Sequence, residues 1–211
     1  MRALGLLLAG ALAVLVSATA SHAAETVNNP DSSTVFLLQY KFSHTPVPYE
    51  AMAQWDSAVR SADEFHKPEA VKQAVARLKA RAASLEGVKR IIVNLASTFS
   101  EYDTQYHEYD VNLSDGTYIP YNNASGHELR IALTNGTKAQ TWPLNPQEAE
   151  DVLRKNNGSR DATLVLTLLL LPSPPAVDGE PVVLNAKIVG YDVLAQSGNA
   201  KLGSVVVERA P

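Results

Sequence analysis

The chain contains no cysteine, which excludes both a small domain held by disulfides and a cysteine-ligated zinc module. Positive charge is not in excess either, because the formal net charge is −4, and this opposes nucleic-acid binding driven by bulk charge. With 211 residues, 45% of them hydrophobic, the chain is long enough to bury a core without cross-links. We therefore expect a soluble globular domain with no nucleic-acid partner.

Motifs that mark common catalytic and cofactor sites are also missing. The sequence has no G-x-S-x-G or S-x-x-K nucleophile motif, no H-E-x-x-H zinc motif, no P-loop and no G-x-G-x-x-G turn. We therefore predict no catalytic residue, no metal ligand and no cofactor from the sequence. The balance leans against an enzyme without deciding the question, because active sites are often assembled from distant residues.

Long apolar runs are scarce, and the longest lies near the N-terminus. Residues 3–16 contain only Ala, Leu, Val and Gly, and they follow Arg2. As a helix this run would be about 21 Å long, which is shorter than the roughly 30 Å hydrocarbon core of a bilayer. Ser21, His22 and Ala23 then fit the small-x-small rule for cleavage. The sequence thus predicts a secretory signal peptide, residues 1–23, that is removed after Ala23.

The signal peptide also predicts where the mature protein works. No later apolar run is long enough to span a membrane, so we expect no membrane span in the mature chain. Export without cysteines favours a bacterial protein of the periplasm or the extracellular space. Residues 24–33 are polar and predict a flexible segment, and residues 34–211 predict a single domain.

Hydrophobic spacing predicts the secondary structure of that domain. Strands are expected at residues 34–42, 88–99, 127–134, 163–171, 182–194 and 201–208, and helices at residues 48–62, at residues 68–85 and from Asn145 to a stop at Asn157.

Several local features refine this pattern. Residues 34–42 carry apolar side chains on both faces and so favour an interior strand, while the strand at residues 88–99 is expected to extend, with a break, to Leu113. Residues 118–126 predict a loop, and Asn135-Gly136 is a hairpin-type dipeptide. Asn145 and Glu148 resemble a capping box. Residues 163–171 predict a central strand buried on both faces.

The order of these elements indicates the fold class. Strands cluster along the chain rather than alternating with helices one by one. This favours an α+β fold with a mainly antiparallel sheet of about five to seven strands and two or three helices packed on one face.

Charge and tyrosine are concentrated in one part of the chain. Residues 91–129 include no Lys or Arg, whereas residues 60–90 contain eight basic and four acidic residues. Within the acidic part, residues 101–110 form the densest polar cluster, and five of the eight tyrosines fall between Tyr102 and Tyr121. An acidic side and a mildly basic side of the molecule are therefore expected.

This cluster supplies the candidate binding residues. Carboxylates with an imidazole can ligate a divalent metal or act as acid and base, although no recognised ligand spacing is present. Tyrosine offers a flat ring that stacks on sugars or peptides, although it is also a common strand residue. The candidates are Tyr102, Asp103, Tyr106, His107, Glu108, Asp110, Tyr118 and Tyr121.

Three hypotheses about function follow. The first is an exported, non-catalytic binding or assembly protein of the cell envelope, with an envelope protein or a glycan as partner. The second is an exported hydrolase or metal-dependent enzyme that uses residues 101–110. The third is a carbohydrate- or cation-binding module that uses residues 102–121.

Overall fold

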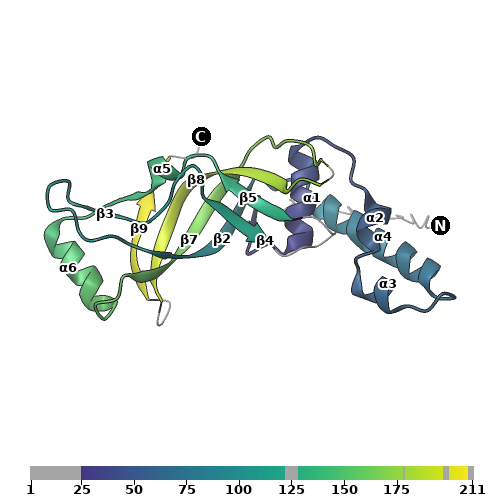
Figure 1. Cartoon of the computed structure of the whole chain (residues 1–211), viewed down its shortest axis with the longest axis horizontal. Coiled ribbons are helices and arrows are strands. Elements are labelled where there is room, and N and C mark those ends of the chain that lie inside the picture. The colour runs from purple at the N-terminus through teal and green to yellow at the C-terminus, as the bar shows by residue number, and fades with distance from the viewer. Residues whose placement is uncertain (1–24, 122–127, 178, 197–199, 209–211) are drawn as a thin grey trace, which may run out of the picture.

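The computed structural model describes residues 25–121, 128–177, 179–196 and 200–208 (Figure 1). The predicted signal peptide and the turn expected at residues 197–199 lie outside the described residues. No described helix has both the length and the apolar character needed to cross a membrane.

Helices and strands are largely grouped along the chain and do not alternate one by one. The helices are α1 (Ser32–Phe42), α2 (Tyr49–Ala53), α3 (Ser57–Ser61), α4 (Lys67–Ser84), α5 (Gly136–Ala139) and α6 (Pro146–Lys155). The strands are β1 (Thr26–Asn28), β2 (Arg90–Thr98), β3 (Glu108–Asp110), β4 (Tyr118–Tyr121), β5 (Leu129–Leu133), β6 (Thr141–Pro143), β7 (Asp161–Leu170), β8 (Val182–Ala195) and β9 (Lys201–Val206).

In the described part of the chain, seven strands form one sheet in the order β1-β2-β7-β8-β5-β4, with β9 also paired to β8. The β1–β2 and β5–β8 pairs are parallel, and the other pairs are antiparallel. Strand β8 is long enough to pair with β5 through its first half and with β9 through its second half. The predicted α+β class is confirmed, and the sheet is mixed but mostly antiparallel. Strands β3 and β6 form a separate two-stranded sheet.

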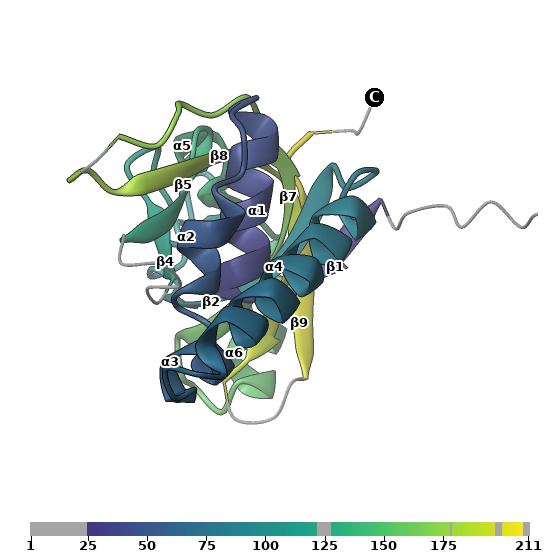
Figure 2. The same ribbon diagram turned by 90° about the vertical axis from the view of Figure 1, so that its right-hand side faces the viewer.

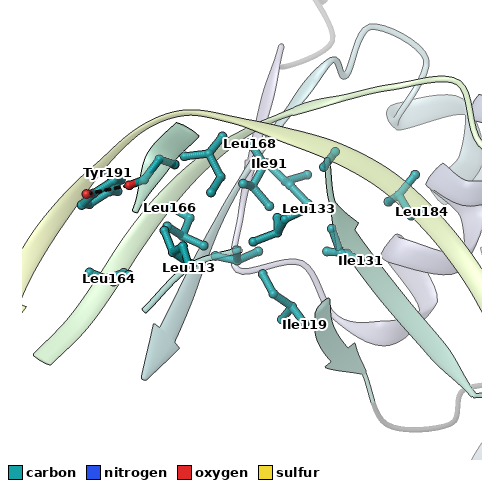
Figure 3. Close-up of a cluster of buried hydrophobic side chains, with 14 of the residues drawn as sticks. Ile91, Leu113, Ile119, Ile131, Leu133, Leu164, Leu166, Leu168, Leu184 and Tyr191 are labelled. Atoms are coloured by element: carbon teal, nitrogen blue, oxygen red, sulfur yellow. Dashed lines mark hydrogen bonds between the residues drawn. The ribbon is translucent and has the colours of Figure 1, made fainter. Parts of the chain in front are cut away.

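Strand β7 lies at the centre of the large sheet, as predicted, between β2 and β8. Leu164, Leu166 and Leu168 on one of its faces are fully buried, and Figure 3 shows them in the main core beside Ile91 and Tyr191. The opposite face is only half-buried. The prediction of burial on both faces is therefore wrong for that second face.

The prediction of a strand at residues 34–42 is wrong, because these residues form helix α1. Asp31 begins this helix by accepting a hydrogen bond from the Thr34 N–H at 2.8 Å. The helix is buried on most sides, since it packs against β8 and α4 and since Gln39 Nε2 donates to the Pro174 carbonyl at 2.8 Å. A helix covered on most sides carries apolar residues around its circumference, and this pattern resembles that of a buried strand.

Helices α2, α3 and α4 form an arm at one end of the molecule, and α6 lies at the other end (Figure 1). The single helix expected at residues 48–62 is two short helices, because Asp56 caps α3 by accepting from the Ala58 N–H at 2.9 Å. Helix α4 is confirmed. Helices α2 and α3 pack mainly against α4, and α6 contacts β9, so packing of the helices on one face of the sheet is not confirmed.

Three smaller predictions also need correction. Residues 118–121 are strand β4 rather than loop, and Asn135-Gly136 leads into helix α5 rather than into a hairpin. The strand expected at residues 88–99 is found as β2, but in its expected extension to Leu113 only the three residues of β3 are a strand. The capping box at Asn145 and Glu148 is confirmed at the start of α6.

Candidate functional site

Residues 103–108 form a tight hairpin loop rather than an extended strand. The backbones of Asp103 and Glu108 exchange two hydrogen bonds, of 2.9 and 3.3 Å. The Asp103 carboxylate accepts from the N–H groups of Gln105 at 2.8 Å and Tyr106 at 3.0 Å. Asp110 likewise accepts from the Asn112 N–H at 2.7 Å. Two of the predicted binding carboxylates therefore hold backbone turns.

A cluster of aromatic rings anchors this hairpin loop. Tyr109 on β3 is fully buried and donates its hydroxyl to the Ala149 carbonyl of α6 at 3.1 Å. Its ring centroid lies 4.9 Å from Phe99, 5.4 Å from Tyr102 and 5.8 Å from Trp142. Burial raises the pKa of Tyr109. The cluster fixes the hairpin loop against the small sheet and α6.

Tyr102 and His107 form a hydrogen-bonded pair at the base of the loop. The Tyr102 hydroxyl donates to the Leu144 carbonyl at 2.8 Å and lies 3.2 Å from His107 Nδ1. A tyrosine hydroxyl has one proton, so this network assigns the donor role in the second contact to His107 Nδ1–H. In the neutral form of the imidazole this arrangement leaves Nε2 as an acceptor.

The protonated Tyr102 hydroxyl and one backbone hydrogen bond of His107 hold this pair in place. Burial, followed by the charges of Asp103 and Glu148, raises the pKa of Tyr102 and so keeps its hydroxyl protonated. The His107 carbonyl accepts from the Leu144 N–H at 3.0 Å, and the His107 backbone has a positive φ of 57°. The His107 backbone is therefore held to Leu144 by this hydrogen bond, which fixes the position from which the imidazole projects.

A hollow of about 440 Å³ opens beside this pair. It is lined by Tyr106, His107, Pro143, Leu144, Asn145, Pro146 and Glu148. The Tyr106 side chain is prominent there, with a relative exposure of 66%. Glu148 accepts from the Asn145 N–H through Oε2 at 2.9 Å, and no described residue donates a hydrogen bond to Oε1. We call this set of residues the Tyr106 hollow.

The structure separates the other predicted residues from this hollow. Glu108 and Asp110 lie on β3 and do not line it. Tyr118 and Tyr121 lie on β4 in the large sheet. The Arg130 guanidinium lies 5.4 Å from the Tyr118 ring, and burial, followed by the charge of Asp31, raises the pKa of Tyr121 to about 12. The two ends of the predicted cluster therefore belong to different surfaces.

Sequence reasoning missed the side of the hollow that comes from residues 143–148. Asn145 and Glu148 were recognised as a helix start, but nothing in the sequence places that start beside His107. In the described residues, no group of three or more His, Asp or Glu side chains is arranged to hold a metal ion.

The residues of the Tyr106 hollow suit reversible binding of a polar, partly flat ligand. One exposed ring offers a stacking surface, prolines and Leu144 add apolar contact, and His107 with Glu148 offers hydrogen-bond acceptors. Comparison with known proteins finds no matching family model, curated protein or solved structure.

Proposed function

We propose that the protein is an exported, non-catalytic binding protein of the cell envelope and that the Tyr106 hollow binds a glycan. The observation that carries this proposal is the exposed Tyr106 ring beside the acceptors His107 and Glu148 in one hollow. Export remains a prediction from residues 1–23.

The chemistry of a sugar ring fits this arrangement. A pyranose has an apolar face of C–H groups that stacks on an aromatic ring, and a rim of hydroxyl groups that need hydrogen-bond partners. Tyr106 supplies the ring, and His107 Nε2 and the Glu148 carboxylate accept from hydroxyl groups. The hollow is shallow and open to solvent, with a volume of about 440 Å³.

Binding is favoured over hydrolysis by the number of carboxylates. Most glycoside hydrolases place two carboxyl groups on opposite sides of the scissile bond, about 5–5.5 Å or about 6.5–9.5 Å apart. Glu148 is the one carboxylate among the residues that line the Tyr106 hollow. Asp103 lies in the same hairpin loop as Tyr106, and its carboxylate accepts from backbone N–H groups.

Two binding experiments test the proposal. One is a titration with soluble N-acetylglucosamine oligomers, and the other is co-sedimentation with purified insoluble peptidoglycan. We expect Tyr106→Ala to weaken binding at least about tenfold, because it removes the stacking surface, and Tyr106→Phe to retain most of it. Tyr118→Ala is the matched control, since Tyr118 is also half-exposed but lies on β4. Equal losses in Tyr106→Ala and Tyr118→Ala, or no binding of either probe by the wild-type protein, would refute the proposal.

A further inference from the structure

A second hollow, of about 370 Å³, lies between α1, α4 and the segment that joins α1 to α2. Figure 2 shows α4 running diagonally past α1, and α2 packs against α4. Apolar side chains make up most of its wall, among them Leu37, Val47, Tyr49 and Ala82, and two lysines, Lys41 and Lys79, also line it. We call it the Lys79 hollow. It shares no lining residue with the Tyr106 hollow.

The ammonium group of Lys41 is occupied by the protein itself. Its Nζ donates to the carbonyls of Leu85 at 2.8 Å, Glu86 at 2.6 Å and Val88 at 2.8 Å. These carbonyls lie at the C-terminal end of α4, where a positive charge is stabilising. A lysine has three N–H donors, so Lys41 has none left for a ligand.

Lys79 is the opposite case. Its side chain is exposed, and within the described residues it forms no ion pair. Its Nζ lies 5.6 Å from the centroid of the Tyr49 ring, which also lines the hollow. This cation–π contact holds the ammonium beside the hollow, and no described carboxylate pairs with it. The hollow therefore offers one free positive group above apolar walls.

Glu86 limits the charge that a ligand can carry. This carboxylate also lines the hollow, so it would repel a ligand with several negative charges. The lining has two ammonium groups, Lys41 and Lys79, against one carboxylate, Glu86, and this balance favours a ligand with a single anionic group. The apolar walls favour an alkyl chain attached to that group.

We propose that the Lys79 hollow binds a single-chain amphiphile with one carboxylate, such as a medium-chain fatty acid. The alkyl chain lies against Leu37, Val47 and Ala82, and the carboxylate pairs with the Lys79 ammonium beside Tyr49. The proposal is independent of glycan binding at the Tyr106 hollow.

Calorimetric titration of the mature protein with octanoate, below its micelle-forming concentration, tests this site. Acetate carries the charge without the chain, and 1-octanol carries the chain without the charge. We expect saturable binding of octanoate, no measurable binding of acetate, and weaker binding of octanol. Octanoate should also raise the unfolding midpoint by mass action.

Variants then locate the site. Lys79→Gln should weaken octanoate binding by up to about fivefold, the loss expected for an exposed charge pair, and should leave octanol binding unchanged. Ala83→Trp places a large side chain from exposed Ala83 into the hollow and should abolish binding of both. Lys72→Gln is the control, because Lys72 is an exposed lysine of the same helix that does not line the hollow.

Two results would overturn the proposal. One is octanoate binding that Lys79→Gln leaves unchanged or that Lys72→Gln weakens equally. The other is octanoate binding that survives Ala83→Trp in a variant whose unfolding transition shows that it is folded. Tyr106→Ala should leave octanoate binding intact, so the outcomes for the two hollows can be separated.

Discussion

At the scale of single residues, Asp31 joins the start of α1 to the side of α4. Its carboxylate accepts from the Thr34 N–H at 2.8 Å and the Thr34 hydroxyl at 2.7 Å, and it pairs with Arg81 at 2.7 Å. Burial alone would raise the pKa of Asp31, but the hydrogen bonds from Thr34 and the charge of Arg81 outweigh burial and lower it below 3.8. The folded protein therefore favours the charged carboxylate.

We expect Asp31→Ala to lower the free energy of unfolding by about 1–2 kcal/mol at pH 7, because the variant loses the N-cap of α1. The pKa of Asp31 is lower in the folded protein than the value of 3.8 expected in the unfolded chain. The stabilisation by the charged carboxylate is therefore fully present above pH 3.8 and is lost as the pH falls through the folded-state pKa. The difference between wild type and variant should therefore shrink in acid. Urea denaturation at pH 7 and pH 3 measures it, with exposed Glu64→Ala as the control for loss of a charge. An equal difference at both pH values would contradict this assignment.

Individual residues also show how far the candidate site follows from the sequence. The density of tyrosine and polar residues was sufficient to select Tyr106 and His107. It was not sufficient to separate them from Asp103 and Asp110, because those carboxylates bind backbone N–H groups that become neighbours only in the folded turns. Glu148 lines the hollow but could not be selected from the sequence, because the Leu144 N–H to His107 carbonyl bond joins two segments that are distant in the chain.

At the scale of elements, the longer helices with a solvent-facing side, α4 and α6, were predictable, whereas the buried helix α1 was not. Helix α6 has one apolar stripe, a capping box and basic residues in its last turn, all of which are local signals. Helix α1 has no such stripe, because its buried residues run consecutively from Thr34 to Gln39. Periodicity alone does not separate such a helix from a buried strand. The deciding contacts come from β8, α4 and the segment around Pro174.

Helix α5 provides an element-scale test. It starts at Gly136, where an added Cβ would lie 1.9 Å from the Ser114 carbonyl oxygen. Backbone atoms there cannot move without displacing the loop before β4, so Gly136→Ala should lower the free energy of unfolding by about 1–3 kcal/mol or more. Gly116→Ala is the matched control, because the nearest atom to its added Cβ is the flexible Ser114 Oγ at 3.8 Å. Chemical denaturation should find the control within about 0.5 kcal/mol of wild type; similar losses in both variants would mean that the α5 contact is not rigid.

At the scale of the whole molecule, the α+β class was predictable but the sheet order was not. Clustered strands along the chain indicate the class. The order, however, depends on β8, whose two halves pair with β5 in parallel and with β9 in antiparallel orientation. A sequence pattern gives the length of such a strand but not its partners. The parallel β1–β2 pair could not be anticipated either, because residues 24–33 have no strand-like pattern.

Export is the whole-molecule prediction that rests on the sequence alone. When the full chain is expressed in a bacterium, we expect the exported protein to begin at or near Ala24, since Ser21, His22 and Ala23 supply the residues that a signal peptidase recognises. N-terminal sequencing of the periplasmic and culture fractions measures this. Exported protein that still begins with Met1 would contradict the prediction.

The central claim is that the Tyr106 hollow is the glycan-binding site, and mapping a titration by two-dimensional amide NMR tests it most directly. The predicted mature chain, residues 24–211 of the 22.7 kDa full chain, would be titrated with a soluble N-acetylglucosamine oligomer. We predict saturable shifts for the amides of Tyr106, His107, Leu144 and Glu148, with Tyr118 unaffected, and their loss in Tyr106→Ala. Saturable shifts centred on β4 or any other surface, or no shifts at saturating oligomer, would contradict the claim.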